Sequence, residues 1–318
     1  MVVLEKAKGK DQFCKNEVRQ SQAYHESEQG NFLVLHNTAP LSAGHSLIIT
    51  KRHILGILDL TLPEKRELFD TINKILPMLL DVYNDGNQAY DIKIRSGAAS
   101  GRTVDHFHVH LIPRKHSPSV KDGIEYQYER IYEKSLQTQK RERAELSADA
   151  VKGLKRELAS NGYLKHGIPT ENVTITNASL PADIADNAFY ESKYFLVAHS
   201  ANPIILGHSL IVPKRDVDSV FKLTQDELCD LAQTYSKIMS VLLRRYGDDT
   251  KSYITSMQTG GYPAMPLDKL HIHVIPRFTN DRYTGKDDEI YYDIYERGRP
   301  MGIMGNDEIR REVEALKR

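Results

Sequence analysis

Residues 106–112, His-Phe-His-Val-His-Leu-Ile, place a histidine at every second position, at His106, His108 and His110. Alternate side chains of an extended strand point to opposite faces, so the pattern predicts a strand over Asp105–Ile112 with its histidines on one face and its apolar residues on the other. Each buried imidazole brings two ring nitrogens that need partners, which makes three of them a costly choice for a packing face. We therefore expect the apolar face in the core and the histidine face in a functional site.

Two kinds of chemistry can use such a row of histidines. Neutral imidazoles can bind zinc or another first-row metal, and His45 could supply a further ligand. An imidazole can also attack phosphorus, form a phosphohistidine and pass the group to water. Residues 96–104 are rich in glycine, serine and alanine and include Arg102, which favours the second chemistry. Small residues let backbone amides approach phosphate oxygens, and the guanidinium group of Arg102 can bind the same oxygens.

The chain repeats itself at a shift of 163 residues, and the match needs no gap over about a hundred positions. The segment Gly44–Ile48 matches Gly207–Ile211 residue for residue, and His108 matches His271. Asn161 and Gly162 punctuate the helical stretch between the two halves. The repeat therefore predicts two domains, residues 1–160 and 161–318.

Each half shows the same order of secondary structure elements. Thr61 with Glu64, and Thr224 with Glu227, have the spacing of a capping box, which predicts a helix start at each. In the first half a stripe of apolar residues at helical spacing follows and predicts the buried face of that helix: Leu68, Ile72, Ile75, Leu79 and Tyr83. With strands expected near 33–35, 44–49 and 90–95 besides the histidine strand, the fold class is α+β, a mostly antiparallel sheet with a packed helix in each half.

The composition limits the binding partners and the cellular compartment that we expect. Lysine plus arginine and aspartate plus glutamate both number 43, so no overall field attracts nucleic acid or an anionic membrane. No apolar run approaches the roughly 20 residues that span a bilayer, and the early charges argue against a secretory signal. We expect a cytoplasmic protein, with the nucleus as a second compartment. Cys14 and Cys229 do not match in the repeat, so a packing role is expected for both.

The segment 106–112 resembles the motif of the histidine-triad (HIT) superfamily, in which three histidines alternate with apolar residues. Gly101–His106, followed by Ile112-Pro113-Arg114-Lys115, is similar to the Fhit-like branch, the dinucleoside polyphosphate hydrolases. The resemblance covers nearly the whole chain twice. It implies that His108 is the nucleophile towards an α-phosphate, that His110 binds the phosphate, that His106 helps to orient the ring, and that His45 completes the network.

The resemblance also implies substrate contacts. Asn37 and Leu47 stand at positions that contact the nucleoside, and Thr103 belongs to the phosphate turn. The chain departs from the family at Arg95 and Arg102, where the family carries glutamines. Two added guanidinium groups should strengthen the binding of a polyphosphate and alter the preferred chain length or the handling of the leaving group.

The second half keeps His208, His271 and His273 and carries Gln258 where the first half has Arg95. It departs at three positions, with Lys269 for the first histidine of the triad, Met265 for Arg102 and Ser200 for Asn37. We expect the ammonium group of Lys269 to lower the pKa of the His271 imidazole. A second site that is impaired or only binds nucleotides is favoured over a fully active one.

The resemblance implies a hydrolase that splits dinucleoside polyphosphates such as Ap3A or Ap4A and releases AMP through a covalent His108 intermediate. No tightly bound cofactor is expected, and Mg²⁺ or Mn²⁺ should accompany the substrate. Family members pair as dimers, so the tandem copy predicts an internal pseudo-dimer, with further oligomerisation open. Three alternatives remain: a nucleoside phosphoramidate or adenylyl-sulfate hydrolase, a nucleotide-binding signalling protein with little turnover, and a metal-dependent oxygenase or isomerase. The charged segment 129–157 predicts a solvated connecting helix.

Overall fold

The computed structural model describes residues 11–38, 40, 44–83, 89–113, 152–153, 155–156, 182–201, 203–259, 269–284 and 306–317. The chain forms two compact units, one of Met1–Ile94 with Thr103–Gly167 and one of Arg95–Arg102 with Ile168–Arg318. Almost all of the charged segment 129–157, as well as Met265 and Arg114, lies outside the described residues.

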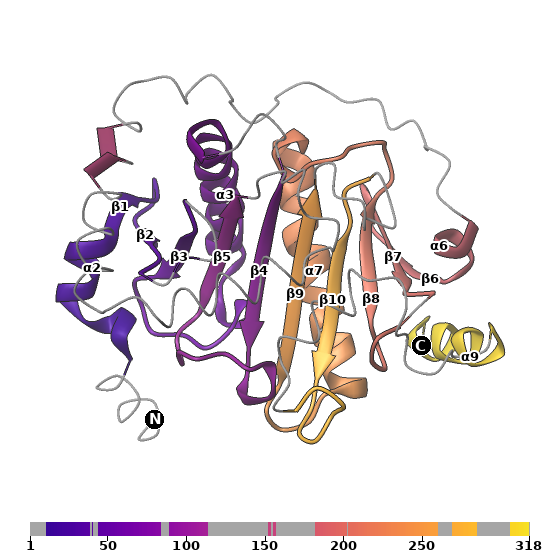
Figure 1. Cartoon of the computed structure of the whole chain (residues 1–318). Coiled ribbons are helices and arrows are strands. Elements are labelled where there is room, and N and C mark those ends of the chain that lie inside the picture. Colours follow the sequence, from indigo (N-terminus) through magenta and orange to yellow (C-terminus); the bar gives the residue numbers. More distant parts are fainter. Residues whose placement is uncertain are drawn as a thin grey trace, which may run out of the picture. The chain divides into compact units, whose positions relative to one another are not determined.

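The described strands of the first unit pair antiparallel with their neighbours and a long helix lies against them, and the last two residues of the strand Tyr90–Ser96 belong to the second unit (Figure 1). The short 3₁₀ helix η1 (Gln12–Cys14) and helix α2 (Asn16–Gln22) come first in the chain, and η2 (Ile57–Asp59) precedes the long helix α3 (Leu62–Tyr83). Helix α3 packs against the histidine strand. The strand order is β1 (Ala23–Glu26), β2 (Phe32–His36), β3 (Ser46–Thr50), β5 (His108–Pro113) and β4 (Tyr90–Ser96).

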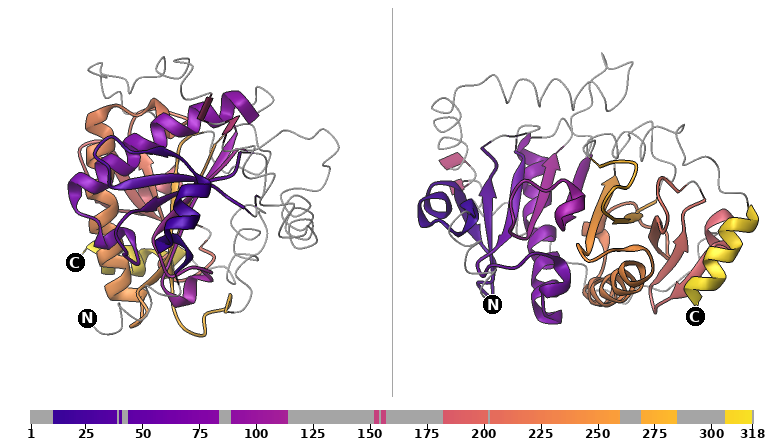
Figure 2. Two further views of the ribbon diagram at one scale, coloured as in Figure 1. Left: turned by 90° about the vertical axis from the view of Figure 1, so that its left-hand side faces the viewer. Right: turned by 90° about the horizontal axis from the view of Figure 1, so that it is seen from below.

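The second unit repeats this plan. Its strand order is β9 (Ser252–Thr259), β10 (Ile272–Arg277), β8 (Ser209–Pro213), β7 (Phe195–His199) and β6 (Ala188–Glu191). Helix α7 (Gln225–Tyr246) follows η5 (Val220–Lys222) and packs against β10, and α6 (Ala182–Asp186) precedes β6. The C-terminal helix α9 (Asn306–Lys317) lies against β6 and β7 (Figure 2). The 3₁₀ turn η3 (Ala98–Ser100) also belongs to this unit, where the Ala99 amide donates to Ser252 Oγ at 2.9 Å.

The predicted α+β class is confirmed, with a mostly antiparallel sheet and a packed helix in each half. Both helix starts follow their capping residues: the Thr224 amide donates to Glu227 Oε2 at 2.7 Å, and the Thr61 amide donates to Glu64 Oε2 at 2.8 Å. In the apolar stripe of α3, four members are buried, namely Leu68, Ile72, Ile75 and Leu79, whereas Tyr83 is partly exposed.

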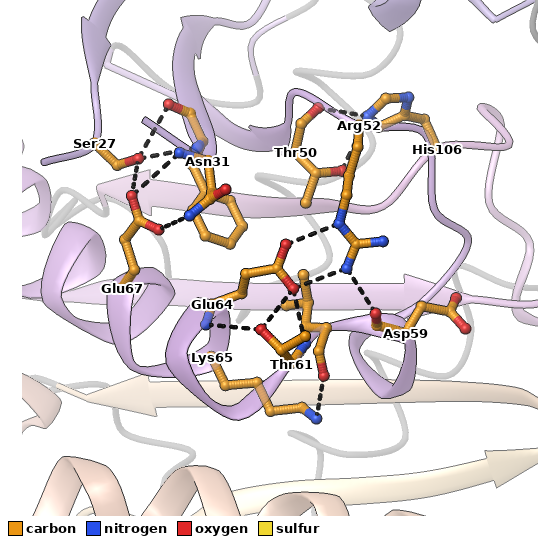
Figure 3. A network of polar contacts seen from close by, with 12 residues as sticks. Ser27, Asn31, Thr50, Arg52, Asp59, Thr61, Glu64, Lys65, Glu67 and His106 are labelled. Atoms are coloured by element: carbon orange, nitrogen blue, oxygen red, sulfur yellow. Dashed lines mark hydrogen bonds and ion pairs between the residues drawn. The ribbon is translucent and has the colours of Figure 1, made fainter. Parts of the chain in front are cut away.

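In each unit an arginine that stands two residues after β3 or β8 pairs with a glutamate in the first turn of the long helix. Arg52 donates through Nε and Nη2 to the two carboxylate oxygens of Glu64, both at 2.8 Å, and through Nη2 to the carbonyl of Asp59 at 2.7 Å (Figure 3). Arg215 and Glu227 repeat the two-bond pair at 2.5 and 2.9 Å. The hydrogen bonds from Arg52 lower the pKa of Glu64 to about 2. These paired charges fix where each helix leaves the sheet.

One glycine in each unit lets the chain pass close to a tyrosine ring. Gly44 has a φ of +80°, and a β-carbon there would lie 2.3 Å from Cδ2 of Tyr83. Gly207 has a φ of +79° and approaches Tyr246 in the same way, at 2.4 Å. Both positions therefore need glycine for its backbone conformation and for its size. The turn that they form delivers the histidine at the next position, His45 or His208, to the start of its strand.

Replacing Gly44 by alanine should destabilise the protein by more than about 2 kcal/mol, because the left-handed backbone and the contact with Tyr83 both disfavour a β-carbon. Gly153→Ala is the matched control, since a β-carbon there meets nothing within 4 Å and alanine favours a helix. Chemical denaturation measures both variants. Equal stability of the two would show that the turn is not constrained as described.

The ion pair of Glu64 predicts how the free energy of unfolding changes with pH. The pKa of Glu64 is about 2 in the folded protein, against 4.5 for an ordinary glutamate. The contribution of the ion pair to the free energy of unfolding is therefore complete above pH 4.5 and is lost as the pH falls towards 2. Glu64→Gln should therefore lower the free energy of unfolding at pH 7 and flatten its decline between pH 4.5 and 2. Glu28→Gln, at a carboxylate 83% exposed, is the control and should leave the curve of the wild type unchanged.

Candidate active site

The structure changes one expectation about the histidine row. Strand β5 begins at His108 rather than at Asp105, and the Phe107 amide donates to the carbonyl of Ile54 at 2.7 Å. His106 precedes the strand, and its imidazole is held by Thr50, whose carbonyl accepts from Nε2 at 2.8 Å. His106 therefore does not share a continuous strand face with the other two histidines.

His108 is held in one tautomer by its own backbone. Its Nδ1 donates to the carbonyl oxygen of His106 at 2.7 Å. A carbonyl can only accept, so the proton lies on Nδ1 and the lone pair lies on Nε2. The residue is 4% exposed, and its ring packs edge-on against the rings of Phe13 and His110, with centroids 5.4 and 5.0 Å away. Nε2 is thus the atom of His108 that can act as a nucleophile.

A second pair of rings lies beside it. His45 Nε2 and His110 Nδ1 are 3.0 Å apart, and the side-chain amide nitrogen of Asn37 lies 3.3 Å from His45 Nδ1. The same Asn37 nitrogen lies 3.3 Å from His45 Nε2, so this side chain contacts the edge of the ring that bears both nitrogens and selects neither as its acceptor. Asn37, predicted to touch the nucleoside, thus lies beside this pair of rings.

The other predicted contacts of the first site lie as follows. Leu47 stands opposite His110 in the sheet and is 5% exposed within an apolar cluster with Phe13. Arg95 lies on β4 and donates through Nη1 to the carbonyl of Gly101 at 3.2 Å. Arg102 is partly exposed and Thr103 is exposed. Their contacts with a phosphate stay predictions.

The second unit keeps the geometry around its nucleophile position. His271 Nδ1 donates to the carbonyl of Lys269 at 2.8 Å, and His208 Nε2 lies 2.9 Å from His273 Nδ1. The Ile204 amide donates to His208 Nδ1 at 3.3 Å, so His208 carries its proton on Nε2 and donates it to His273. Three of the four histidine positions of the first site therefore have counterparts in the same arrangement.

These histidines are held neutral by burial. Burial, aided by the nearby His199 and His271, lowers the pKa of His208 to about 3, and burial also lowers the pKa of His273 well below its ordinary value. The pKa of His271 is lowered as we expected, but burial is the cause, and its hydrogen bond to the Lys269 backbone acts in the opposite direction. The Lys269 ammonium group faces the carbonyl of Lys214 at 3.4 Å.

Other positions of the second site differ more. The backbone amide of Ser200 donates to the carbonyl of His208 at 2.9 Å, and the backbone amide of Asn37 donates to the carbonyl of His45 at 3.0 Å. The serine lacks the side-chain amide that Asn37 places beside the His45 ring. Gln258 lies on β9, and the turn that contains Met265 lies outside the described residues. The substitutions could be identified from the sequence. In the structure, the part of the second site that keeps the arrangement of the first consists of three histidines, His208, His271 and His273.

Sequence reasoning missed a group of side chains around His106. Asp11 Oδ2 lies 2.5 Å from His106 Nδ1 and 3.0 Å from His53 Nδ1, and Cys14 Sγ lies 3.7 and 3.9 Å from the same two nitrogens. Burial alone would raise the pKa of Asp11, but its hydrogen bond and charge interaction with His106 lower it well below its usual range. Cys14, for which we expected a packing role, thus lies among polar groups. Its separation from His106 by about ninety residues left no sequence signal.

The family model of the HIT domain matches the chain twice, over residues 19–117 and 182–280. The chain belongs to the HIT domain family. The two matches confirm both the resemblance and the tandem repeat that the sequence indicated.

Among curated relatives, the bis(5'-nucleosyl)-tetraphosphatase (asymmetrical) of Schizosaccharomyces pombe is 34% identical over 90 residues, which are 28% of this chain and 48% of that protein. The bis(5'-adenosyl)-triphosphatase of Dictyostelium discoideum is 29% identical over 129 residues, 41% of this chain and 82% of that protein. The chain thus spans about half the length of the first relative and most of the second.

Two solved structures from Arabidopsis thaliana share the fold. A GalT-like protein superposes with a TM-score of 0.55 at 11% identity and covers 86% of this chain and 85% of its own. An ADP-glucose phosphorylase with bound ADP-glucose superposes with a TM-score of 0.54 at 10% identity, covering 85% and 80%. At these identities the likeness shows the fold alone.

Among the helices that the structure describes, none has the length and apolar character needed to cross a membrane.

The tautomers of the second site can be measured by nitrogen-15 NMR of the imidazole rings. At pH 6 we expect His208 to be neutral with its proton on Nε2, because its pKa is about 3 and its Nδ1 accepts from Ile204. His271 should be protonated on Nδ1, since that nitrogen donates to a carbonyl. A His208 ring that titrates near pH 6.5, or a His271 ring protonated on Nε2 alone, would contradict this arrangement.

Proposed function

We propose that this protein is a hydrolase of dinucleoside polyphosphates of the Ap3A or Ap4A type that releases AMP through a nucleotidyl intermediate on His108. The observation that carries the proposal is the hydrogen bond from His108 Nδ1 to the His106 carbonyl, which leaves the lone pair on Nε2. The two relatives described above, at 34% and 29% identity, are named as dinucleoside polyphosphate hydrolases, which supports this substrate class.

The proposed reaction has two displacements at the α-phosphorus. His108 Nε2 attacks phosphorus, an N–P bond forms, and the P–O bond to the remaining nucleotide breaks. Water then attacks the same phosphorus and releases a proton to solvent, the N–P bond breaks with its electron pair returning to His108 Nε2, and AMP leaves. The hydrogen bond to the His106 carbonyl stabilises the positive charge that develops on the ring while it carries the nucleotidyl group.

His45 and His110 serve the phosphate in this proposal. We propose that this pair, 3.0 Å apart, takes the tautomers of its counterpart in the second unit, where His208 donates to His273, so that His110 Nε2 can donate to a non-bridging oxygen beside His108. Arg95 and Arg102 are proposed to add positive charge for the polyphosphate, and Asn37, Leu47 and Thr103 to contact the nucleotide. Mg²⁺ or Mn²⁺ is proposed to arrive with the substrate, because hard cations are commonly held by phosphates and water.

The second unit is proposed to bind nucleotide with weaker turnover. It retains His208, His271 and His273 in the arrangement of the first site, but it has Ser200 where Asn37 stands. The internal pairing of the two repeats as a pseudo-dimer and a cytoplasmic location are also proposals, motivated by the repeat and by the composition.

His108→Asn should reduce hydrolysis of Ap3A and Ap4A by at least about a thousand-fold, because the amide cannot form the phosphorus bond. His271→Asn, the same change at the matched position, should lose far less. Product analysis with Ap3A, Ap4A and adenosine phosphoramidate measures turnover and substrate class, and acid-free quenching with labelled substrate tests for a nucleotide bound to protein.

Full activity of the His108 variant would refute the assignment of the nucleophile. Faster turnover of the phosphoramidate than of either dinucleotide would keep the nucleophile and change the substrate class. Tight binding of dinucleotides without products would instead identify a binding protein.

A further inference from the structure

Strand β5 lies between β3 and β4, and His110 has one partner on each side (Figure 1). Leu47 of β3 and Lys93 of β4 are both paired with His110 in the antiparallel register. Residues directly opposite each other share one face of a sheet, with β-carbons about 4.5 to 5.5 Å apart. A row of three side chains, Leu47, His110 and Lys93, therefore crosses the face that carries the histidines.

Lys93 is a buried cation in this row. The residue is 4% exposed, the same fraction as His108, and its Nζ lies 3.5 Å from Oδ2 of Asp91, which is 1% exposed. Asp91 and Lys93 are two residues apart in β4, so both side chains point to the face of the histidines. Lysine is seldom buried unless it is paired, and removing two charges from water costs free energy that packing alone does not return. The position of the pair beside His110 therefore indicates a role in the site.

The second unit forms the same strands without this pair. At the shift of the repeat, Ile254 and Ser256 replace Asp91 and Lys93, and both are 0% exposed. Ser256 is paired with His273, the third histidine of that unit. The ammonium group and its carboxylate are thus replaced together by neutral side chains, and the strand pairing is kept. The fold does not require the ion pair, which distinguishes the first site by a positive charge beside its third histidine.

We propose that Lys93 binds the phosphates beyond the α-phosphate and selects polyphosphate substrates over nucleotides with a single phosphate. This inference rests on the function proposed above, in which the nucleoside lies at Leu47 and the α-phosphate at His108 and His110. The row then orders the substrate across the strands, with the nucleoside at β3, the α-phosphate at β5 and the following phosphates at β4. Neighbouring strands are about 4.8 Å apart, so a chain that continues away from Leu47 beyond His110 arrives at the Lys93 ammonium group.

The ammonium group would also act on the leaving group. When the P–O bond at the α-phosphorus breaks, its electron pair stays on the oxygen of the departing nucleotide, and negative charge accumulates on the phosphates beside Lys93. A cation there stabilises that charge. Asp91 holds the ammonium group in place before the substrate arrives. A nucleotide whose leaving group carries no phosphate gains nothing from Lys93, and the uncharged Ser256 gives the second unit no such preference.

Lys93→Met keeps most of the side-chain length and removes the charge. It should lower kcat/KM for Ap4A at least about tenfold, as expected for the loss of a charged hydrogen bond, and change kcat/KM for adenosine phosphoramidate less than about twofold. Lys93→Arg restores the cation and should retain most of the activity with Ap4A. Lys74→Met is the matched control, since Lys74 Nζ also lies 3.5 Å from a carboxylate, that of Glu28, and this variant should leave both substrates unchanged.

A double variant separates this role from folding. Asp91→Ile with Lys93→Ser installs the residues of the second unit, which forms the same strand pair with them. The double variant should unfold in a cooperative transition like that of the wild type and show the same selective loss with Ap4A. An equal loss with both substrates, or no loss in the folded double variant, would overturn the proposal and leave Asp91 and Lys93 as a structural ion pair.

Binding measurements separate this inference from the proposed reaction. Calorimetry in the His108→Asn background, which prevents turnover, compares Ap4A with AMP. Adding Lys93→Met should weaken the binding of Ap4A at one site at least about tenfold and leave the affinity for AMP within about twofold. That result would support the role of Lys93 even if the wild type hydrolysed neither dinucleotide. Equal affinities for Ap4A with and without Lys93 would overturn the proposal while leaving the reaction at His108 untouched.

Discussion

A hydrogen bond from an imidazole to the backbone carbonyl two residues earlier sets the tautomer of the central histidine in both halves of this protein. His108 donates to the His106 carbonyl at 2.7 Å, and His271 donates to the Lys269 carbonyl at 2.8 Å. Since the acceptor belongs to the backbone, it stays an acceptor whatever side chain its residue carries, and it always leaves the lone pair on Nε2. An imidazole that is to attack phosphorus through Nε2 needs this tautomer, and the neighbouring parts of each unit bring two further histidines to it.

The partners arrive through a turn that the fold constrains tightly. Gly44 and Gly207 pass against Tyr83 and Tyr246, and the following histidine enters the sheet beside β5 or β10. Its Nε2 lies 3.0 or 2.9 Å from Nδ1 of the third histidine of the row, His110 or His273. In the second half, the proton on the far nitrogen of that ring is set by a chain of donors that begins at the Ile204 backbone amide.

Local pattern predicted much of this arrangement from the sequence. Capping boxes at Thr61 and Thr224, the alternation around His108 and the internal repeat each depend on residues close in the chain or on a fixed shift, so they could be found without coordinates. The start of β5 was misplaced because the Phe107 amide bonds to Ile54, a distant partner that alternation does not reveal. The cluster at His106 was missed for the same reason, since Asp11 approaches it only through the folded chain.

The exchange of His106 for Lys269 bears on why the two sites differ. The side chain at this position faces Thr50 in one half and Lys214 in the other, and it contributes to the nucleophile through its backbone carbonyl. A lysine can therefore replace the histidine while the tautomer of His271 is preserved, and burial rather than the lysine charge lowers the pKa of that ring. The weaker turnover proposed for the second unit would then arise from other positions. Ser200 in place of Asn37 removes a side-chain donor next to the histidine pair, and in the proposed reaction this change would affect the holding of substrate rather than the preparation of His271 as a nucleophile.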